Sequence, residues 1–190
     1  RYGDFDGLNV TMPYKKAVIP FLDQLTDAAK AVGAVNTIYR REGKLIGHNT
    51  DLSGFEHMLR SSGLQPKGKK CLVLGSGGAS VTAVAVLKGM GANVVVISRS
   101  GEDNYKNLSR HSDAAILCNC TPVGMYPNVD VSPLSPTHFP ALEGVLDLIF
   151  NPARTRLLQE AEARGIRPAP VDRVENLPGF GLVAQRTGSV

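Results

Sequence analysis

From residue 69 onward, short apolar runs of strand length alternate with segments of helical pattern. This alternation is typical of βαβ units and therefore predicts a parallel sheet. Each run has the length expected of a strand that is buried on both faces. The expected strands are 71–74, 94–97, 114–118 and 145–149, with a helix that is apolar almost all round over 79–88 and an amphipathic helix over 154–164.

Before this region, apolar and polar residues are mixed, without the regular alternation of apolar runs and helical segments. We therefore expect an α/β protein that combines a Rossmann-like, doubly wound parallel sheet over 65–175 with a smaller α/β domain over 1–64. Gln65-Pro-Lys-Gly68 reads as the linker between them, and 176–190 as a return segment toward the first domain.

The N-terminal region, residues 1–64, contains one predicted hairpin that bears on function. Two strands, 34–39 and 44–48, flank a turn at Glu42-Gly43. Pairing outward from the turn puts Asn36 opposite about Asn49, so that Asp51 lies near Asn36 at the open end of the hairpin. Two polar side chains that converge in this way indicate a site. The alternative is a capped hairpin end, with Asp51 starting a helix over 52–59.

A glycine-rich turn, Gly75-Ser-Gly-Gly-Ala-Ser80, joins the first strand of the parallel region to its apolar helix. A dinucleotide fingerprint needs this context, because a tight turn and free N–H groups at a helix start can hold phosphate. Ser80 stands where the fingerprint has Gly or Ala. The alternative is an ordinary strand-to-helix turn that uses glycine for its positive φ.

The second strand ends at Ser98-Arg99-Ser100 and bears on the choice of cofactor. An NAD site usually has Asp or Glu near this position to accept from the ribose 2′-OH, but no carboxylate occurs before Glu102. Arg99 instead offers a charge and a planar face that suit the 2′-phosphate of NADP. The pattern therefore favours NADP as cofactor, with NAD as the alternative. Arg99 could also be an exposed arginine at a strand end with no role in cofactor binding.

Charge and cysteine content bear on the class of binding partner and on the cellular compartment. The net charge of +4 comes from scattered basic residues, which favours an anionic small molecule as partner over nucleic acid. No apolar run is long enough to span a membrane. Arg1 to Asp4 show no signal-peptide pattern. Cys71, Cys118 and Cys120 form no CxxC, which fits a reducing cytoplasm, and we predict no metal site.

One string, Gly7-Leu-Asn-Val-Thr-Met-Pro-Tyr-Lys15, resembles the substrate-domain motif of the shikimate dehydrogenase family. The resemblance continues, in the family's order, over essentially the whole chain. The further matching strings are Gly33–Thr37, Gly47–Asp51, the glycine turn, Asn119-Cys-Thr-Pro-Val-Gly-Met125, Asp147-Leu-Ile-Phe-Asn-Pro152 and Leu182-Val-Ala-Gln185.

The resemblance implies a two-domain enzyme that reversibly reduces 3-dehydroshikimate with NADPH, in the pathway to chorismate and the aromatic amino acids. It makes 1–64 the substrate domain. It also implies a role for each matching residue: catalysis for Lys15 and its acidic partner Asp51; substrate binding for Asn9, Thr11, Asn36 and Gln185; cofactor binding for Gly75, Gly77, Gly78, Ala79, Ser98, Arg99 and Leu148.

These residue types suit the reduction of a ketone. A lysine beside a carboxylate, largely closed off from water, can polarise the ketone oxygen and exchange a proton. The cofactor supplies the hydride. Amide and hydroxyl side chains can bond ring hydroxyls without changing charge. Without the motif, Lys15 would read as an exposed lysine at a helix start.

The chain departs from the family pattern at three places. Family members carry a further stretch before Gly7, including a serine pair for the substrate carboxylate, so we expect the first domain to be incomplete at its N-terminus. Such a chain should bind NADP but turn shikimate over poorly. Phe150 stands where the family often has Tyr, and cannot donate that hydroxyl bond. The motif at Gly179–Gln185 is one residue short.

Two other functions stay open. One is a relative that acts on quinate or a similar polyol acid, with NAD as cofactor. The other is a dinucleotide-binding module without catalysis. The sequence does not give an oligomeric state.

Overall fold

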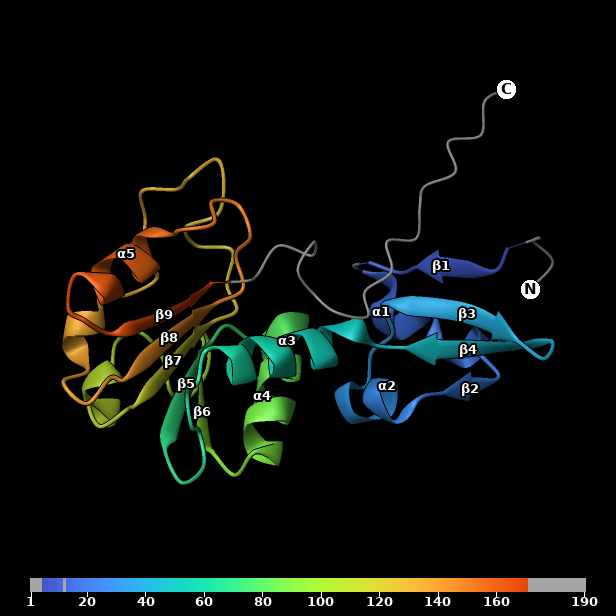
Figure 1. Ribbon diagram of the computed structural model, residues 1–190, viewed down its shortest axis with the longest axis horizontal. Helices are drawn as coiled ribbons and strands as arrows, with labels where there is room; N and C mark the ends of the chain where they lie inside the picture. The colour runs from blue at the N-terminus through green and yellow to red at the C-terminus, as the bar shows by residue number, and fades with distance from the viewer. Residues whose placement is uncertain (1–4, 12, 171–190) are drawn as a thin grey trace.

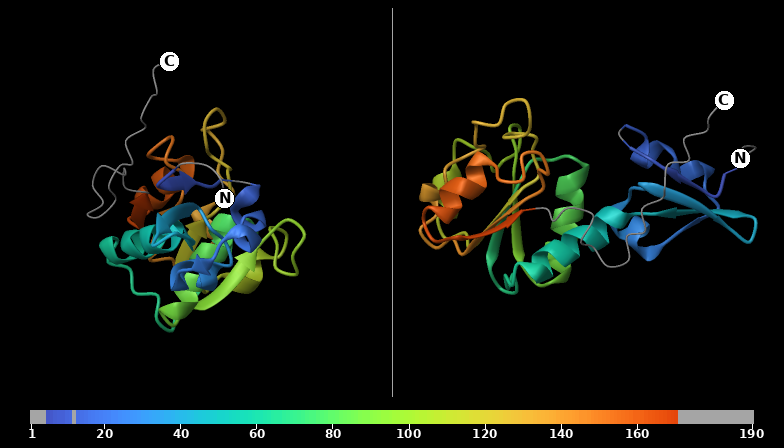
Figure 2. Two further views of the ribbon diagram at one scale, coloured as in Figure 1. Left: turned by 90° about the vertical axis from the view of Figure 1, so that its right-hand side faces the viewer. Right: turned by 45° about the horizontal axis from the view of Figure 1, so that its top comes forward.

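The computed structural model describes residues 5–11 and 13–170. Two sheets lie side by side in Figure 1, joined by helix α3 (Thr50–Ser61), which runs from the end of the smaller sheet to the larger one. The right-hand view in Figure 2 shows the same separation. In the described residues, no helix is long and apolar enough to cross a membrane.

The smaller sheet has strands in the order β1-β3-β4-β2. Strands β1 and β4 pair antiparallel with β3, and β2 runs parallel to β4. Helix α2 (Asp27–Val32) begins at a Thr26 cap and ends at Gly33, whose φ is 66°. Its Ala29 packs with Val35, Ile38 and Leu45 in a small core. The strands are β1 (Gly7–Asn9), β2 (Gln24–Leu25), β3 (Thr37–Arg41) and β4 (Lys44–His48).

The predicted hairpin is confirmed, including its register. Thr37 pairs with His48 and Arg41 with Lys44, around a two-residue turn at Glu42 and Gly43. These two have φ of 52° and 74°, the left-handed pair that matches strand twist in tight hairpins.

The larger sheet is parallel, with strands in the order β6-β5-β7-β8-β9. This is the expected Rossmann-like arrangement. The order reverses between β5 and β7, and such a switch point is where open α/β sheets bind ligands. The edge strand β9 was not predicted. The strands are β5 (Lys70–Leu74), β6 (Asn93–Ile97), β7 (Ile116–Asn119), β8 (Gly144–Asp147) and β9 (Arg167–Pro170).

Both faces of this sheet are covered, as strands with no polar face require. Helices α3 and α4 (Gly78–Gly89) bury one face, with side chains such as Leu59 and Leu87. Helix α5 (Arg156–Glu162) packs on the other face with Leu157 and Leu158.

The connections into β7 and β8 differ from the helical crossovers typical of this fold. In the described residues they contain only short 3-10 turns, η2 (Leu108–His111) and η3 (Pro136–His138). The first connection is rich in side chains that bond their own backbone, such as Asn104 and Asn107, and these compete with a helix. The second contains Pro122, Pro127, Pro133 and Pro136, which break helices.

Helix α3 belongs to both regions of the chain. It begins beside the small hairpin, whereas its Phe55, Met58 and Leu59 are buried in the core under the large sheet. The predicted boundary at residues 64 and 65 follows this helix, and it remains a prediction.

Candidate active site

Lys15 and Asp51 form an ion pair, with 2.7 Å between Lys15 Nζ and Asp51 Oδ2. Lys15 lies on α1 (Tyr14–Ala17) and Asp51 in the first turn of α3. The backbone brings them together because the Val35 N–H donates to the Lys15 carbonyl at 2.8 Å, which ties α1 to the residues leading into β3. The structure thus brings the two residues together, and their catalytic roles remain predictions.

Asn36 fixes the carboxylate from its other side. Its Nδ2 donates to Asp51 Oδ1 and to Thr50 Oγ1, at 2.8 Å each. Its Oδ1 accepts from the Thr50 N–H at 3.0 Å. The sequence left two interpretations of this hairpin end open, a site or a helix cap. Asn36 makes both kinds of contact, because it bonds the helix backbone and the acid that faces Lys15.

The start of α3 depends on Asn49, which the sequence reasoning overlooked as a site residue. Its Oδ1 accepts from the N–H groups of Asp51 at 2.9 Å and Leu52 at 3.3 Å, while its Nδ2 donates to the Ala34 carbonyl at 3.0 Å. Asn49 is buried, so this cap orients the first turn and with it Asp51. An asparagine directly before a polar helix start was the available signal.

The pair is partly open to water. The side chains of Lys15 and Asp51 are 27% and 42% exposed. Within the described residues the pair is therefore not closed off from water, because it lies at the open end of the hairpin rather than inside a core.

In the described part of the chain, the other residues predicted to bind substrate make no hydrogen bond with the Lys15–Asp51 pair. Asn9 pairs with Thr37 across β1 and β3, and Thr11 follows β1 with its side chain exposed. The intervening Val10 N–H donates to the Asn36 carbonyl at 2.8 Å, so this strand end lies against the same hairpin end. Gln185 and the shortened motif at 179–185 lie outside the described residues.

The glycine turn follows β5 at the switch point. Gly75 has a φ of 102°, and a Cβ on it would lie 3.1 Å from Thr121 Cγ2 and 3.3 Å from the Cys120 carbonyl oxygen. Glycine is therefore required there by the fold.

Gly77 and Gly78 are different. A Cβ at either position meets nothing within 4 Å, and neither has a positive φ. Gly77 caps α4 without a side-chain bond, so no capping side chain occupies the N–H groups of the first helical turn, to which Ala79 belongs. Packing within the described residues therefore does not require glycine at these two positions, and they leave open space beside the helix start.

Ser98 and Arg99 follow β6, and Leu148 follows β8, at the same carboxyl edge of the parallel sheet. Arg99 is exposed. Burial raises the pKa of Tyr105, and the Arg99 charge opposes that shift. Tyr105 was not predicted from the sequence.

A buried polar network supports this edge. Asp147 is fully buried, and it accepts from Asn119 Nδ2 at 3.1 Å, the Ile149 N–H at 3.1 Å and Thr155 Oγ1 at 2.6 Å. Burial raises its pKa despite these donors. The Leu148 N–H donates to the Asn119 carbonyl at 3.1 Å, so the network fixes the backbone on both sides of Leu148.

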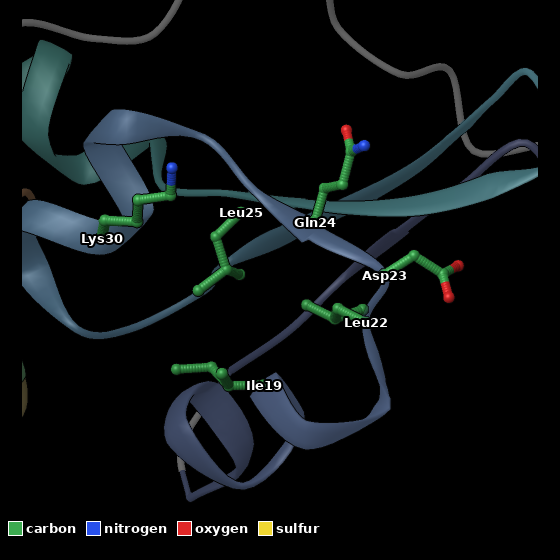
Figure 3. A pocket seen from close by; sticks show the side chains of 6 residues that line it. All are labelled: Ile19, Leu22, Asp23, Gln24, Leu25 and Lys30. Carbon is green, nitrogen blue, oxygen red and sulfur yellow. The ribbon is translucent and has the colours of Figure 1, made fainter.

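A cavity of about 500 Å³ lies elsewhere on the smaller sheet region (Figure 3). Its walls contain neither Lys15 nor Asp51. We therefore do not assign the chemistry to it. It is lined by Ile19, Leu22, Asp23, Gln24, Leu25 and Lys30.

Comparison with known proteins decides the family. Residues 1–38 match the family described as the shikimate dehydrogenase substrate binding domain. Shikimate dehydrogenase (NADP(+)) of Syntrophomonas wolfei is 36% identical over 96% of this chain and 68% of its own length. The chain belongs to the shikimate dehydrogenase family.

Solved structures of family members agree. Thermus thermophilus shikimate 5-dehydrogenase, in complex with NADP(H) and shikimate, is 35% identical with a TM-score of 0.77 over 87% of this chain and 67% of that one. Quinate dehydrogenase from Corynebacterium glutamicum, in complex with NAD, is 27% identical with a TM-score of 0.79 over the same shares. The chain thus spans about two thirds of the length of the relatives that it matches.

Proposed function

We propose that this chain carries the catalytic and cofactor sites of an NADP-dependent shikimate dehydrogenase, which reversibly reduces 3-dehydroshikimate to shikimate on the route to chorismate and the aromatic amino acids. The observation that carries the proposal is the Lys15–Asp51 ion pair, held by Asn36. A dinucleotide-binding module without catalysis would have no use for a lysine, an acid and an amide fixed together at the end of a separate sheet.

The residues present fit a dinucleotide cofactor. The open space beside Gly77 and Gly78 at the start of α4 would leave room for the pyrophosphate, and Ser98 with Arg99 would hold the 2′-phosphate. Leu148 would lie beside the nicotinamide half. When bound, NADPH supplies the hydride that the ketone carbon accepts.

Lys15 supplies the proton in this proposal. Its ammonium donates to the ketone oxygen as the carbon accepts hydride, so that the C=O becomes CH–OH and Lys15 becomes a neutral amine. Asp51 Oδ2, at 2.7 Å, keeps the ammonium aimed and its charge balanced before the transfer. Asn36 prevents the carboxylate from turning away. Asn9, Thr11, Asn36 and Gln185 bond the ring hydroxyls and set the substrate's orientation.

A quinate dehydrogenase that uses NAD is the second candidate, and two observations favour it. Phe150 lacks the hydroxyl with which the family often holds shikimate, and its side chain is exposed beside the carboxyl edge of the large sheet. Glu102 and Asp103 also follow Arg99 closely in the chain. We place the protein in the cytoplasm, in keeping with the free thiols of Cys71, Cys118 and Cys120.

Substrate and cofactor profiling tests the proposal. Initial rates are followed at the nicotinamide absorbance band with shikimate or quinate, each with NADP or NAD. The proposed function predicts the highest kcat/KM for shikimate with NADP. A higher value for quinate with NAD would establish the second candidate instead.

A further inference from the structure

The connection after β6 folds into a compact loop, residues 98–107, where many Rossmann folds have a helix. Asn104 Nδ2 and Asn107 Nδ2 both donate to the Glu102 carbonyl, at 3.2 Å and 2.9 Å. The Ser98 N–H donates to the Asp103 carbonyl at 3.2 Å. The loop therefore returns to its own start, and Asp103 lies beside the residues that follow β6.

This loop carries charges of both signs. Arg99 and Glu102 are exposed, and the Asp103 side chain is 30% exposed. A carboxylate close to Arg99 would repel a 2′-phosphate and would suit the free 2′-OH of NAD. A site that prefers NADP therefore has to keep the Asp103 carboxylate away from the phosphate.

His111 holds the Asp103 carboxylate in the structure. Its Nε2 lies 2.9 Å from Asp103 Oδ1, and its side chain, on η2, is only 10% exposed. A carboxylate can only accept, so Nε2 is the donor. Asp103 is thus turned toward the buried imidazole. The nearby carboxylate of Asp113 is held separately by Lys70 at 2.6 Å, so it does not compete for His111.

We propose that His111 is a specificity-determining residue that acts by position: it holds the Asp103 carboxylate away from Arg99 and so allows the site to prefer a 2′-phosphate over a 2′-hydroxyl. The inference rests on the proposed function, because it needs the adenosine end of the cofactor to lie at Ser98 and Arg99.

Dissociation constants for NADP and NAD, measured by calorimetry on the whole chain, test this. His111→Phe should lower the preference for NADP over NAD by about three- to tenfold, because the freed carboxylate repels the phosphate through solvent. Since His111 Nδ1 is buried with no hydrogen-bond partner in the described part of the chain, phenylalanine breaks no hydrogen bond of this side chain other than the one to Asp103. His111→Gln, which keeps a donor, should largely retain the preference.

Removing the Asp103 charge should reverse the loss of NADP preference in His111→Phe. Asp103→Asn in the His111→Phe background should restore the wild-type preference, whereas Asp103→Asn alone should change it less than about twofold, because the carboxylate is already held away. This single variant also serves if His111→Phe does not fold.

Three outcomes would overturn the inference. They are equal weakening of both cofactors in His111→Phe, failure of Asp103→Asn to restore the preference, and a large gain in preference from Asp103→Asn alone. A wild-type chain that binds NAD as well as NADP would instead overturn the cofactor assignment in the proposed function, which the wild-type measurement shows by itself.

Discussion

At the scale of single residues, Asp51 has different partners on its two carboxylate oxygens. Oδ2 accepts from Lys15 and Oδ1 from Asn36. The acid is thus held from both sides, while the Lys15 side chain stays partly exposed and so accessible to a bound ketone. The hairpin pattern was sufficient to predict that Asn36 and Asp51 meet. Lys15 could be assigned only through the family motif, because nothing in its local sequence distinguishes it from Lys16.

The first prediction concerns Lys15. Lys15→Ala should lower kcat by about a hundredfold or more, with a smaller change in KM, because the ammonium acts mainly on the transition state. Lys16→Ala is the matched control, since Lys16 is exposed on the same short helix and should leave kcat within about twofold. Steady-state rates with shikimate and NADP measure both, and near-normal kcat in Lys15→Ala would remove the lysine from the mechanism.

The second prediction concerns Arg99. Arg99→Ala should weaken NADP by about ten- to a hundredfold, the loss expected for charge-assisted bonds to a phosphate, and NAD much less. Arg110→Ala provides the control, because Arg110 is exposed on η2 beyond the 98–107 loop. If Arg99→Ala weakened both dinucleotides equally, the residue would only contact adenine or support the fold.

At the scale of elements, the sequence predicted the buried strands well because each is a short apolar run with no competing interpretation. Strand β9 was missed because it contains Pro168 and Pro170, which argue against a strand. The sheet tolerates them since β9 is an edge and pairs only with β8. The 98–107 loop was missed because its order comes from side-chain bonds to its own backbone, which hydrophobic periodicity does not reveal.

The third prediction uses the turn before α4. Gly77→Ala should leave the free energy of unfolding within about 0.5 kcal/mol of wild type, because the new Cβ meets open space at an ordinary φ. It should weaken NADP about tenfold or more by blocking bonds to the phosphates. Gly89→Ala, at the exposed far end of the same helix, is the control and should leave the NADP dissociation constant unchanged. If Gly77→Ala bound NADP as tightly as wild type, the phosphates would have to bind elsewhere.

The fourth prediction concerns the buried strand β5. Burial raises the pKa of Cys71 from 9.0 to about 11. Between these pH values the unfolded thiol loses its proton while the folded thiol keeps it, so this contribution to stability is complete below pH 9 and is lost as the pH rises toward 11.

Chemical denaturation across that range should therefore show a shallower fall in the free energy of unfolding for Cys71→Ala than for wild type. Val73 is buried on the same face of β5, so Val73→Ala controls for the loss of packing that a smaller side chain causes. It should be less stable than wild type at every pH but keep the wild-type slope. Parallel slopes in wild type and Cys71→Ala would show that the thiol does not contribute.

At the scale of the whole molecule, the proposed chemistry is divided between two sheets. The Lys15–Asp51 pair lies on helices beside the small sheet, in α1 and in the first turn of α3, and the proposed dinucleotide features lie at the carboxyl edge of the large sheet. Helix α3 links them, because Asp51 lies in its first turn while Phe55, Met58 and Leu59 are buried against the large sheet. The family motifs predicted both halves of the site. They did not reveal this shared helix, since its packing involves residues far apart in the chain.

The central claim is that these two halves perform one hydride transfer, and product stoichiometry tests it most directly. The wild-type chain and Lys15→Ala are each incubated with shikimate and NADP, with NADPH measured by absorbance and 3-dehydroshikimate by mass spectrometry. We expect one NADPH for each 3-dehydroshikimate in the wild type, and a rate lower by about a hundredfold in Lys15→Ala. Absence of both products from the wild-type reaction, or equal rates in the two proteins, would contradict the account.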